Sequence, residues 1–97
     1  MIPRKELLLK ECNFKTSRSG GKGGQNVNKV SSKVELIFNV ANSVYFTEEQ
    51  KELLAIRLAT RLDSDHNLHI VSQEDRSQLL NKQRTIKKLE LLLIKCL

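Results

Sequence analysis

The chain has 97 residues, of which 39% are hydrophobic and 29% are charged, as is usual for a soluble globular protein. We expect a single domain over residues 1–97, because this length leaves no room for a second one, and a core of aliphatic rather than aromatic side chains. Lys and Arg outnumber Asp and Glu by 17 to 11, and most of the acidic side chains lie between residues 34 and 75. The sequence therefore predicts one basic and one acidic face and favours nucleic acid as the partner.

The two cysteines, Cys12 and Cys96, lie far apart and do not form a C-x-x-C pair, and both histidines belong to another segment. This pattern predicts free thiols in a reducing compartment, no metal site and no cofactor. The C-terminal apolar run, residues 91–94, is too short to span a bilayer, and residues 7–9 are too short for a secretory signal. We expect a cytoplasmic protein with no membrane partner.

The N-terminal part contains a short apolar segment, residues 7–14, whose second half is predicted to be a strand. Residues 15–32 then show no hydrophobic period, and all four glycines of the chain lie between positions 20 and 24. The sequence predicts a long exposed loop here. Loops of this length inside a compact domain are usually functional or disordered.

The middle of the chain begins with clean alternation over residues 34–40, which predicts a half-buried strand with Val34, Leu36, Phe38 and Val40 on its buried side. Thr47 and Gln50 fit a capping box, which predicts the start of a helix. We expect this helix to end near Asp63, with its apolar face formed by Leu54, Leu58 and Leu62.

The last third of the chain predicts a turn at residues 65–67, a strand over residues 68–72 and a helix from Asp75 onward. The apolar face of this last helix is expected to contain Leu79, Ile86, Leu89 and Leu93. The predicted order is β-β-α-β-α. We therefore expect an α+β fold, a single small domain in which two helices pack a three-stranded sheet and a long glycine loop joins the first two strands.

The glycine loop is open to three interpretations. A phosphate loop of the Walker type is disfavoured, because Gln25 stands where that pattern needs a glycine and no amphipathic helix follows. The G-x-x-G pattern of KH domains occurs at residues 20–23 and 21–24, so a non-catalytic RNA clamp remains open. The third interpretation is a loop tip that brings backbone amides and one carboxamide into an active site formed by RNA.

The residues around the loop favour this third interpretation. The run from Ser17 to Leu36 resembles the catalytic domain of class I peptide release factors, and more closely the short stalled-ribosome rescue hydrolases of the YaeJ/ArfB type. Their motif R-x-x-G-x-G-G-Q-x-V-N-K is met at Arg18, Gly21, Gly23, Gly24, Gln25, Val27, Asn28 and Lys29. A second signature, R-S-Q-x-x-N, is met at Arg76, Ser77, Gln78 and Asn81. Gln78 and Asn81 are also interpreted as cap or packing residues of the last helix.

This resemblance implies hydrolysis of the peptidyl-tRNA ester in the peptidyl transferase centre of the ribosome, with large-subunit rRNA and peptidyl-tRNA as partners. The implied catalytic residues are Gly23, Gly24 and Gln25. The Gln25 backbone N–H would stabilise charge on the tRNA 3′ oxygen, and its side chain would orient a water. Glutamine cannot serve as a general base, so positioning and preorganised donors would carry the catalysis.

Basic residues near the loop and on the last helix are the expected RNA contacts. Lys22 departs from the family, where proline or alanine is frequent, and adds a charge that can meet a phosphate. The complete set is Arg18, Lys22, Lys29, Lys33, Arg76, Lys82 and Arg84.

The ends of the chain complete the comparison with the rescue factors. Those proteins continue into a Lys/Arg-rich tail, whereas this chain stops at Leu97, and we expect it to be a trimmed catalytic domain. With so few residues before the loop, we expect no codon-reading domain and therefore codon-independent action by a monomer. The rival hypothesis is a non-catalytic RNA- or ribosome-binding module that uses the same basic loop.

Overall fold

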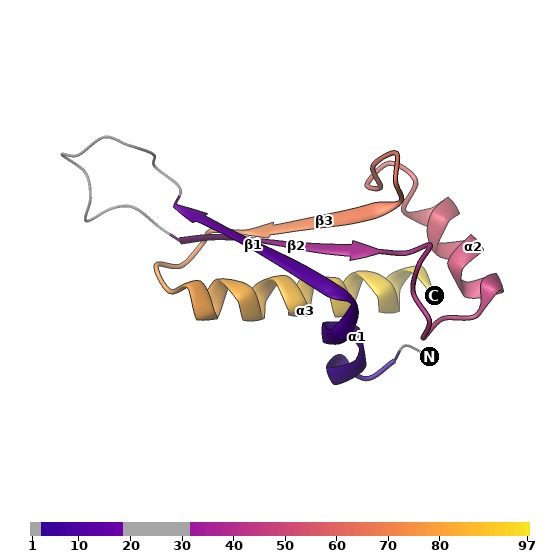
Figure 1. The fold of residues 1–97 in the computed structure, drawn as a ribbon, viewed down its shortest axis with the longest axis horizontal. Coiled ribbons are helices and arrows are strands. Elements are labelled where there is room, and N and C mark those ends of the chain that lie inside the picture. Colours follow the sequence, from indigo (N-terminus) through magenta and orange to yellow (C-terminus); the bar gives the residue numbers. More distant parts are fainter. Residues whose placement is uncertain (1–2, 19–31) are drawn as a thin grey trace.

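The computed structural model describes residues 3–18 and 32–97, and these form a three-stranded sheet with three helices (Figure 1). The α+β class and the predicted β-β-α-β-α order are confirmed, with one further helix ahead of the first strand. In chain order the elements are α1 (Lys5–Glu11), β1 (Cys12–Arg18), β2 (Ser32–Asn39), α2 (Glu48–Arg57), β3 (Asn67–Ser72) and α3 (Gln78–Cys96).

Helix α1 was not expected from the sequence. Its apolar residues are consecutive and show no helical period, and the preceding Arg4 offers no side-chain cap. So short a helix is not stable by itself and depends on tertiary packing. Leu8, only 1% exposed, supplies that packing, and Glu11 at the helix end accepts hydrogen bonds from the Ser43 hydroxyl and from the Val44 N–H at 2.8 Å.

The sheet has the order β1-β2-β3, and both neighbouring pairs are antiparallel. The predicted phase of β2 is confirmed, because Val34, Leu36 and Phe38 are buried and their neighbours are not. Strand β1 extends further than predicted. Residues 15–18 pair with β2, although the sequence predicted a loop there. This polar segment has no buried face, and backbone hydrogen bonds to β2 keep it extended.

Helix α2 begins as predicted, because Thr47 and Gln50 form a complete capping box. The predicted end near Asp63 is wrong: the helix ends at Arg57 and the chain continues in turns. The spacing of Leu54, Leu58 and Leu62 suggested a longer helix. Leu62 keeps a helix-like hydrogen bond from its N–H to the Leu58 carbonyl, at 3.1 Å, and is half-buried, but it lies in the turns that follow the helix. His66, in the turn before β3, has a positive φ of 68°.

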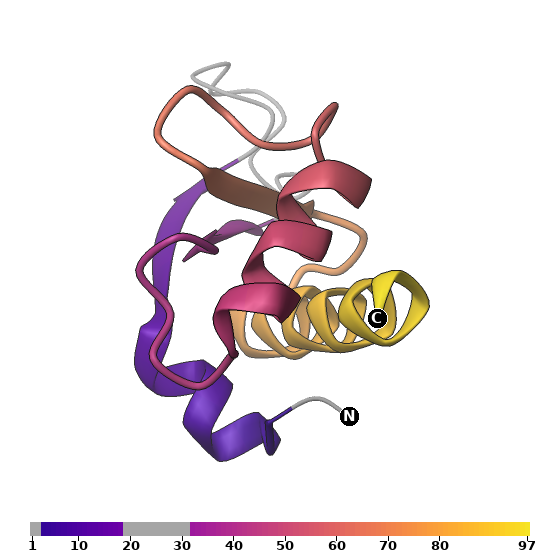
Figure 2. The same cartoon turned by 90° about the vertical axis from the view of Figure 1, so that its right-hand side faces the viewer.

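Helix α3 runs along one face of the sheet and α2 packs against its C-terminal part (Figures 1 and 2). Three of its four predicted apolar positions are buried, but Leu79 is 64% exposed. The buried stripe begins instead at Asn81 and Thr85, both 0% exposed. Leu79 lies two positions before Asn81, about 200° around the helix, and therefore lies outside the buried stripe.

Two further sequence predictions concern the thiols and membranes. Cys12 and Cys96 are both free, and burial together with the nearby Glu11 carboxylate raises the pKa of the Cys12 thiol to about 11. Among residues 3–18 and 32–97, no helix has the length and apolar character needed to cross a bilayer.

Candidate functional site

The glycine-rich segment joins two adjacent strand ends. Residues 19–31 lie outside the described residues, and with them the predicted residues Lys22, Gly23, Gly24, Gln25 and Lys29. The strand ends themselves are described: Arg18 at the end of β1 and Ser32 at the start of β2 are register partners (Figure 1). The segment therefore starts and finishes at one end of the β1–β2 hairpin, which we call the hairpin end.

A buried asparagine ties the hairpin end to the rest of the domain. The Asn81 side chain, 0% exposed, donates to the carbonyl of Ser32 and to the carbonyl of Asp75 at 2.8 Å. Its oxygen accepts from the Asp75 N–H at 3.0 Å and lies 3.2 Å from the Ser72 hydroxyl. Every donor and acceptor of the carboxamide is thus used. This one side chain joins the start of β2, the end of β3 and the turn before α3.

The second sequence signature forms the start of α3. Ser77 is its N-cap and accepts from the Leu80 N–H at 3.2 Å. The interpretation of Asn81 as a packing residue is confirmed, whereas Gln78 is exposed at the first helical position and neither caps the helix nor packs in the core. The signature therefore has a structural part, Ser77 and Asn81, and an exposed part, Arg76 and Gln78.

A surface groove of about 280 Å³ lies beside the hairpin end, between β1 and the start of α3. Within it the Lys82 ammonium stands 4.6 Å from the centre of the Phe14 ring, a cation–π contact that holds the charge over the groove. Exposed Leu79 adds an apolar wall. The remaining lining residues are Thr16, Val34 and Gln78.

The other predicted RNA-contact residues are divided between two sides of the sheet. Arg76 and Arg84 are exposed near the start of α3, where Arg84 approaches the Asp75 carboxylate at 3.7 Å. Lys33 lies next to buried Val34 on β2, so it belongs to the opposite face of the sheet from Lys82. Of Arg18 only the backbone is described, at the end of β1. The structure thus places Arg76, Lys82 and Arg84 at and near the start of α3, with Lys82 toward β1 and Arg84 toward Asp75, and separates Lys33 from all three.

Two carboxylates beside the start of α3 were not predicted as part of the site. Glu74 receives hydrogen bonds from the Ser72 hydroxyl and from Lys88 at 3.1 Å, and these lower its pKa to about 2. Asp75 contributes its backbone to Asn81 and its side chain to Arg84. The sequence did contain a signal for this polar cluster. Ser72 and Asn81 are polar residues at positions where the strand and helix periods predict buried apolar side chains, and buried polar groups need hydrogen-bond partners nearby.

A second titratable cluster lies on the face of the sheet away from α3. His69 on β3 contacts the Glu35 carboxylate at 2.9 Å through Nδ1 and the Asp63 carboxylate at 2.8 Å through Nε2. Both contacts raise the pKa of His69, and the contact with Asp63 has the larger effect. The hydrogen bond from His69 in turn lowers the pKa of Asp63 to about 2. In the part of the chain that the structure describes, no three His, Cys, Asp or Glu side chains are arranged to hold a metal ion.

Comparison with known proteins identifies the family. Residues 4–96 match the RF-1 domain. The chain belongs to the RF-1 domain family. The match covers almost the entire sequence, including both signatures and the hairpin end. The RF-1 domain is the family of the class I release factor catalytic domain that the glycine motif indicated.

Several curated proteins are similar to this RF-1 domain. The large ribosomal subunit protein mL62 of Mus musculus is 32% identical over 91% of this chain and 40% of its own length. The peptidyl-tRNA hydrolase ArfB of Pseudomonas putida is 40% identical over 79% of this chain and 56% of its own. Peptide chain release factor 1 of Chloroherpeton thalassium is 33% identical over 87% of this chain and 16% of its own. The chain therefore spans about half or less of the length of each of these relatives.

Proposed function

We propose that this RF-1 domain hydrolyses the ester bond of peptidyl-tRNA in the peptidyl transferase centre of stalled ribosomes, without reading a codon. The observation that carries the proposal is the complete glycine motif at residues 18–29 in a chain that matches the family over residues 4–96. The similarity to a peptidyl-tRNA hydrolase supports the same reaction. The hairpin end, fixed by Asn81, is a rigid base from which such a loop can act.

The proposed chemistry is a hydrolysis in which water attacks the carbonyl carbon that links the peptide to the tRNA. The bond from that carbon to the tRNA 3′ oxygen breaks, and this oxygen takes up a proton as the peptide leaves as a carboxylic acid. The Gln25 backbone N–H donates to the developing charge on the 3′ oxygen, and the Gln25 side chain orients the water. Gly23 and Gly24 allow the backbone to aim that N–H. Ribosomal RNA completes the site.

The proposed docking surface is the start of α3 together with the basic residues next to the loop. Arg76, Lys82 and Arg84 are exposed at and near the start of α3, so each can contact an rRNA phosphate. When Arg84 contacts a phosphate, its ion pair with Asp75 has to be shared with that phosphate or broken. The other proposed contacts are Arg18, Lys22, Lys29 and Lys33. The proposed partner is a ribosome in the cytoplasm, bound by one copy of the chain.

A non-catalytic ribosome-binding module is the second candidate. The observation in its favour is the similarity to a ribosomal subunit protein, mL62. Both functions use the same basic surface, so binding data alone do not distinguish them. The discriminating quantity is the rate of ester hydrolysis.

A peptide-release assay tests the proposal. Ribosomes that carry labelled peptidyl-tRNA and no codon in the decoding site are mixed with the chain, alone or followed by a short Lys/Arg-rich tail of the kind found in rescue factors. We expect release by the parent and slow release by Gly24→Ala and Gln25→Ala, with Gln83→Ala, an exposed glutamine on α3, as the control. Ribosome cosedimentation without release, or equal release by both loop variants and the parent, would overturn the catalytic proposal.

A further inference from the structure

A second groove lies far from the hairpin end, between the C-terminal half of α3 and the edge of the sheet at β3. Strand β3 is the last strand of the sheet, and among residues 3–18 and 32–97 its outer side is paired with a single bridge, between Leu68 and Leu62. The space between this edge and α3 measures about 290 Å³ and is lined by Arg61, Ile70, Lys88, Leu91, Leu92 and Lys95. We call it the α3–β3 groove. Lys95 lies seventeen positions beyond Gln78, roughly 25 Å along the helix axis from the start of α3.

The interior of the α3–β3 groove is aliphatic. Ile70, 7% exposed, and half-buried Leu92 belong to the core and its margin, whereas Leu91 is 55% exposed. Water next to such a surface is released when a partner's aliphatic side chain covers it. The groove is therefore suited to an apolar side chain.

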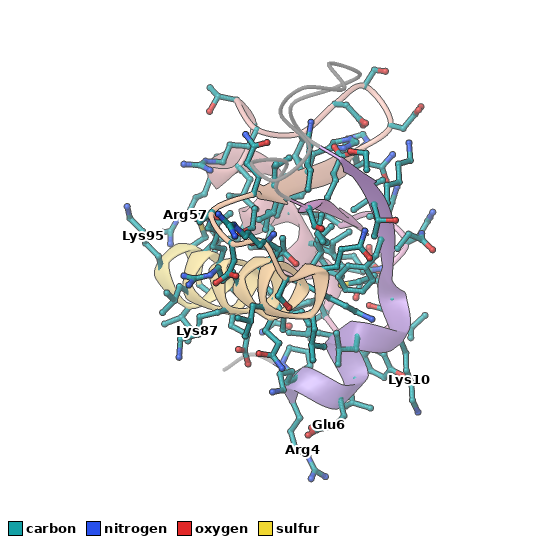
Figure 3. All side chains as sticks on the ribbon, turned by 90° about the vertical axis from the view of Figure 1, so that its left-hand side faces the viewer. Arg4, Glu6, Lys10, Arg57, Lys87 and Lys95 are labelled. Atoms are coloured by element: carbon teal, nitrogen blue, oxygen red, sulfur yellow. The ribbon has the colours of Figure 1, made fainter. Side chains whose placement is uncertain are left out.

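The rim of the groove is positively charged. Lys88 pairs with Glu74 at 3.1 Å and bonds to the Val71 carbonyl, so its charge is largely compensated. Arg61 and Lys95, by contrast, form no ion pair with any residue in the described ranges 3–18 and 32–97, and none of the lining residues is acidic. Lys95 points to the side of α3 where Arg57 lies, whereas Lys87 points toward the side of α1 (Figure 3).

From these features we infer that the α3–β3 groove binds an acidic segment of another protein, one that presents an aliphatic side chain flanked by carboxylates. The aliphatic side chain covers Leu91 and Leu92, and the carboxylates pair with Arg61 and Lys95. RNA fits less well, because single strands gain binding energy by stacking on aromatic rings, and all four aromatic residues of the chain lie outside the groove. This interaction is separate from the proposed hydrolysis.

A titration followed by NMR tests the inference on the whole 97-residue chain. The probe is a synthetic peptide of glutamates with leucines at helical spacing, and its matched control replaces the leucines by serine. We expect the leucine peptide to shift the methyl signals of Leu91, Leu92 and Ile70, and the serine peptide to bind about tenfold more weakly. If both peptides bind equally, charge alone explains the binding and the inference is overturned.

Substitutions in the groove give a second readout. Leu91→Ser and Lys95→Glu change exposed side chains, so the fold is retained, and each is expected to weaken binding of the leucine peptide about tenfold. Lys10→Glu carries the same charge change on α1, outside the groove, and should bind like the parent. Peptide release from ribosomes should be unchanged in all three variants, so failure of this inference and failure of the proposed hydrolysis are separate results.

Two alternative occupants are measured in the same series. A uridine oligonucleotide that shifts the Leu91 and Leu92 methyl signals more strongly than the leucine peptide would show that the groove binds RNA instead. Sedimentation that reveals concentration-dependent self-association lost in Leu91→Ser would show that a second copy of the chain covers the groove. Either result overturns the inference of an acidic protein partner.

Discussion

The side-chain amide of Asn81 donates to the backbone carbonyl of Ser32, which links the first turns of α3 to the strand end where the glycine segment rejoins the sheet. The two residues are 49 positions apart in the sequence. The same carboxamide satisfies both backbone polar groups of Asp75. The asparagine of the second signature therefore has a structural role, and its replacement should lower the stability of the fold.

We expect Asn81→Ala to lower the free energy of unfolding, because the carbonyls of Ser32 and Asp75 lose a buried donor, at a cost of about 1–3 kcal/mol for each unpaired group. Urea denaturation followed by circular dichroism measures this change. The control is Gln83→Ala, two positions later on an exposed face of the same helix, which should change stability by less than about 0.5 kcal/mol. Equal midpoints for the two variants would contradict the role assigned to Asn81.

The proposed roles of the Gln25 backbone and side chain can be separated. Gln25→Pro removes the backbone N–H and should reduce the rate of peptide release by about 10²–10³, the usual cost of one such donor. Gln25→Ala keeps the N–H and loses only the carboxamide, so its single-turnover release rate should lie between those of the parent and the proline variant. A proline variant as fast as the parent would show that the N–H is not the catalytic donor.

The start of α3 should contribute to ribosome binding through charge. Lys82→Gln removes the ammonium held over Phe14 and should lower the slope of log affinity against log salt by about one. The matched control is Lys10→Gln on α1, an exposed lysine outside the proposed docking surface, which should leave the slope unchanged (Figure 3). Filter binding to ribosomes at several salt concentrations provides both slopes. Identical slopes for parent and Lys82→Gln would remove Lys82 from the contact surface.

The contacts of His69 with Glu35 and Asp63 predict a pH-dependent stability. The raised pKa of His69 means that its contribution is complete below its usual value of 6.5 and is lost as pH rises through the higher folded value. The lowered pKa of Asp63 means that its contribution is present above its usual 3.8 and is lost as pH falls toward about 2. The cluster should therefore stabilise the fold most between about pH 4 and 6.5.

Comparison of the parent with His69→Gln measures this effect. Because the cluster is exposed, the difference in stability should be small and should shrink with added salt. Melting temperatures recorded from pH 3 to pH 9 should differ most near pH 5 and converge at alkaline pH. His66→Gln is unsuitable as a control because of its positive φ, so Gln73→Ala on the exposed chain after β3 serves instead. A constant difference across the pH range would contradict the assignment.

The sequence by itself determined the elements whose signals are local. Alternation placed the buried face of β2, and the capping box of Thr47 and Gln50 placed the start of α2, because both patterns depend on neighbours only a few residues away. The glycine motif likewise identified the family that the match over residues 4–96 then showed. These features need no knowledge of distant contacts.

Only the tertiary structure decided the rest. Helix α1 forms because Leu8 is buried in the core, and residues 15–18 form a strand because β2 lies beside them. Leu79 is exposed because the buried face of α3 contains Asn81 instead. Asn81 is buried there because its side chain donates to the carbonyl of Ser32, which is far away in the sequence. The α3–β3 groove also exists only in the folded chain. Each of these depends on residues brought together by folding, which a sequence pattern with a period of 2 or about 3.6 residues does not contain.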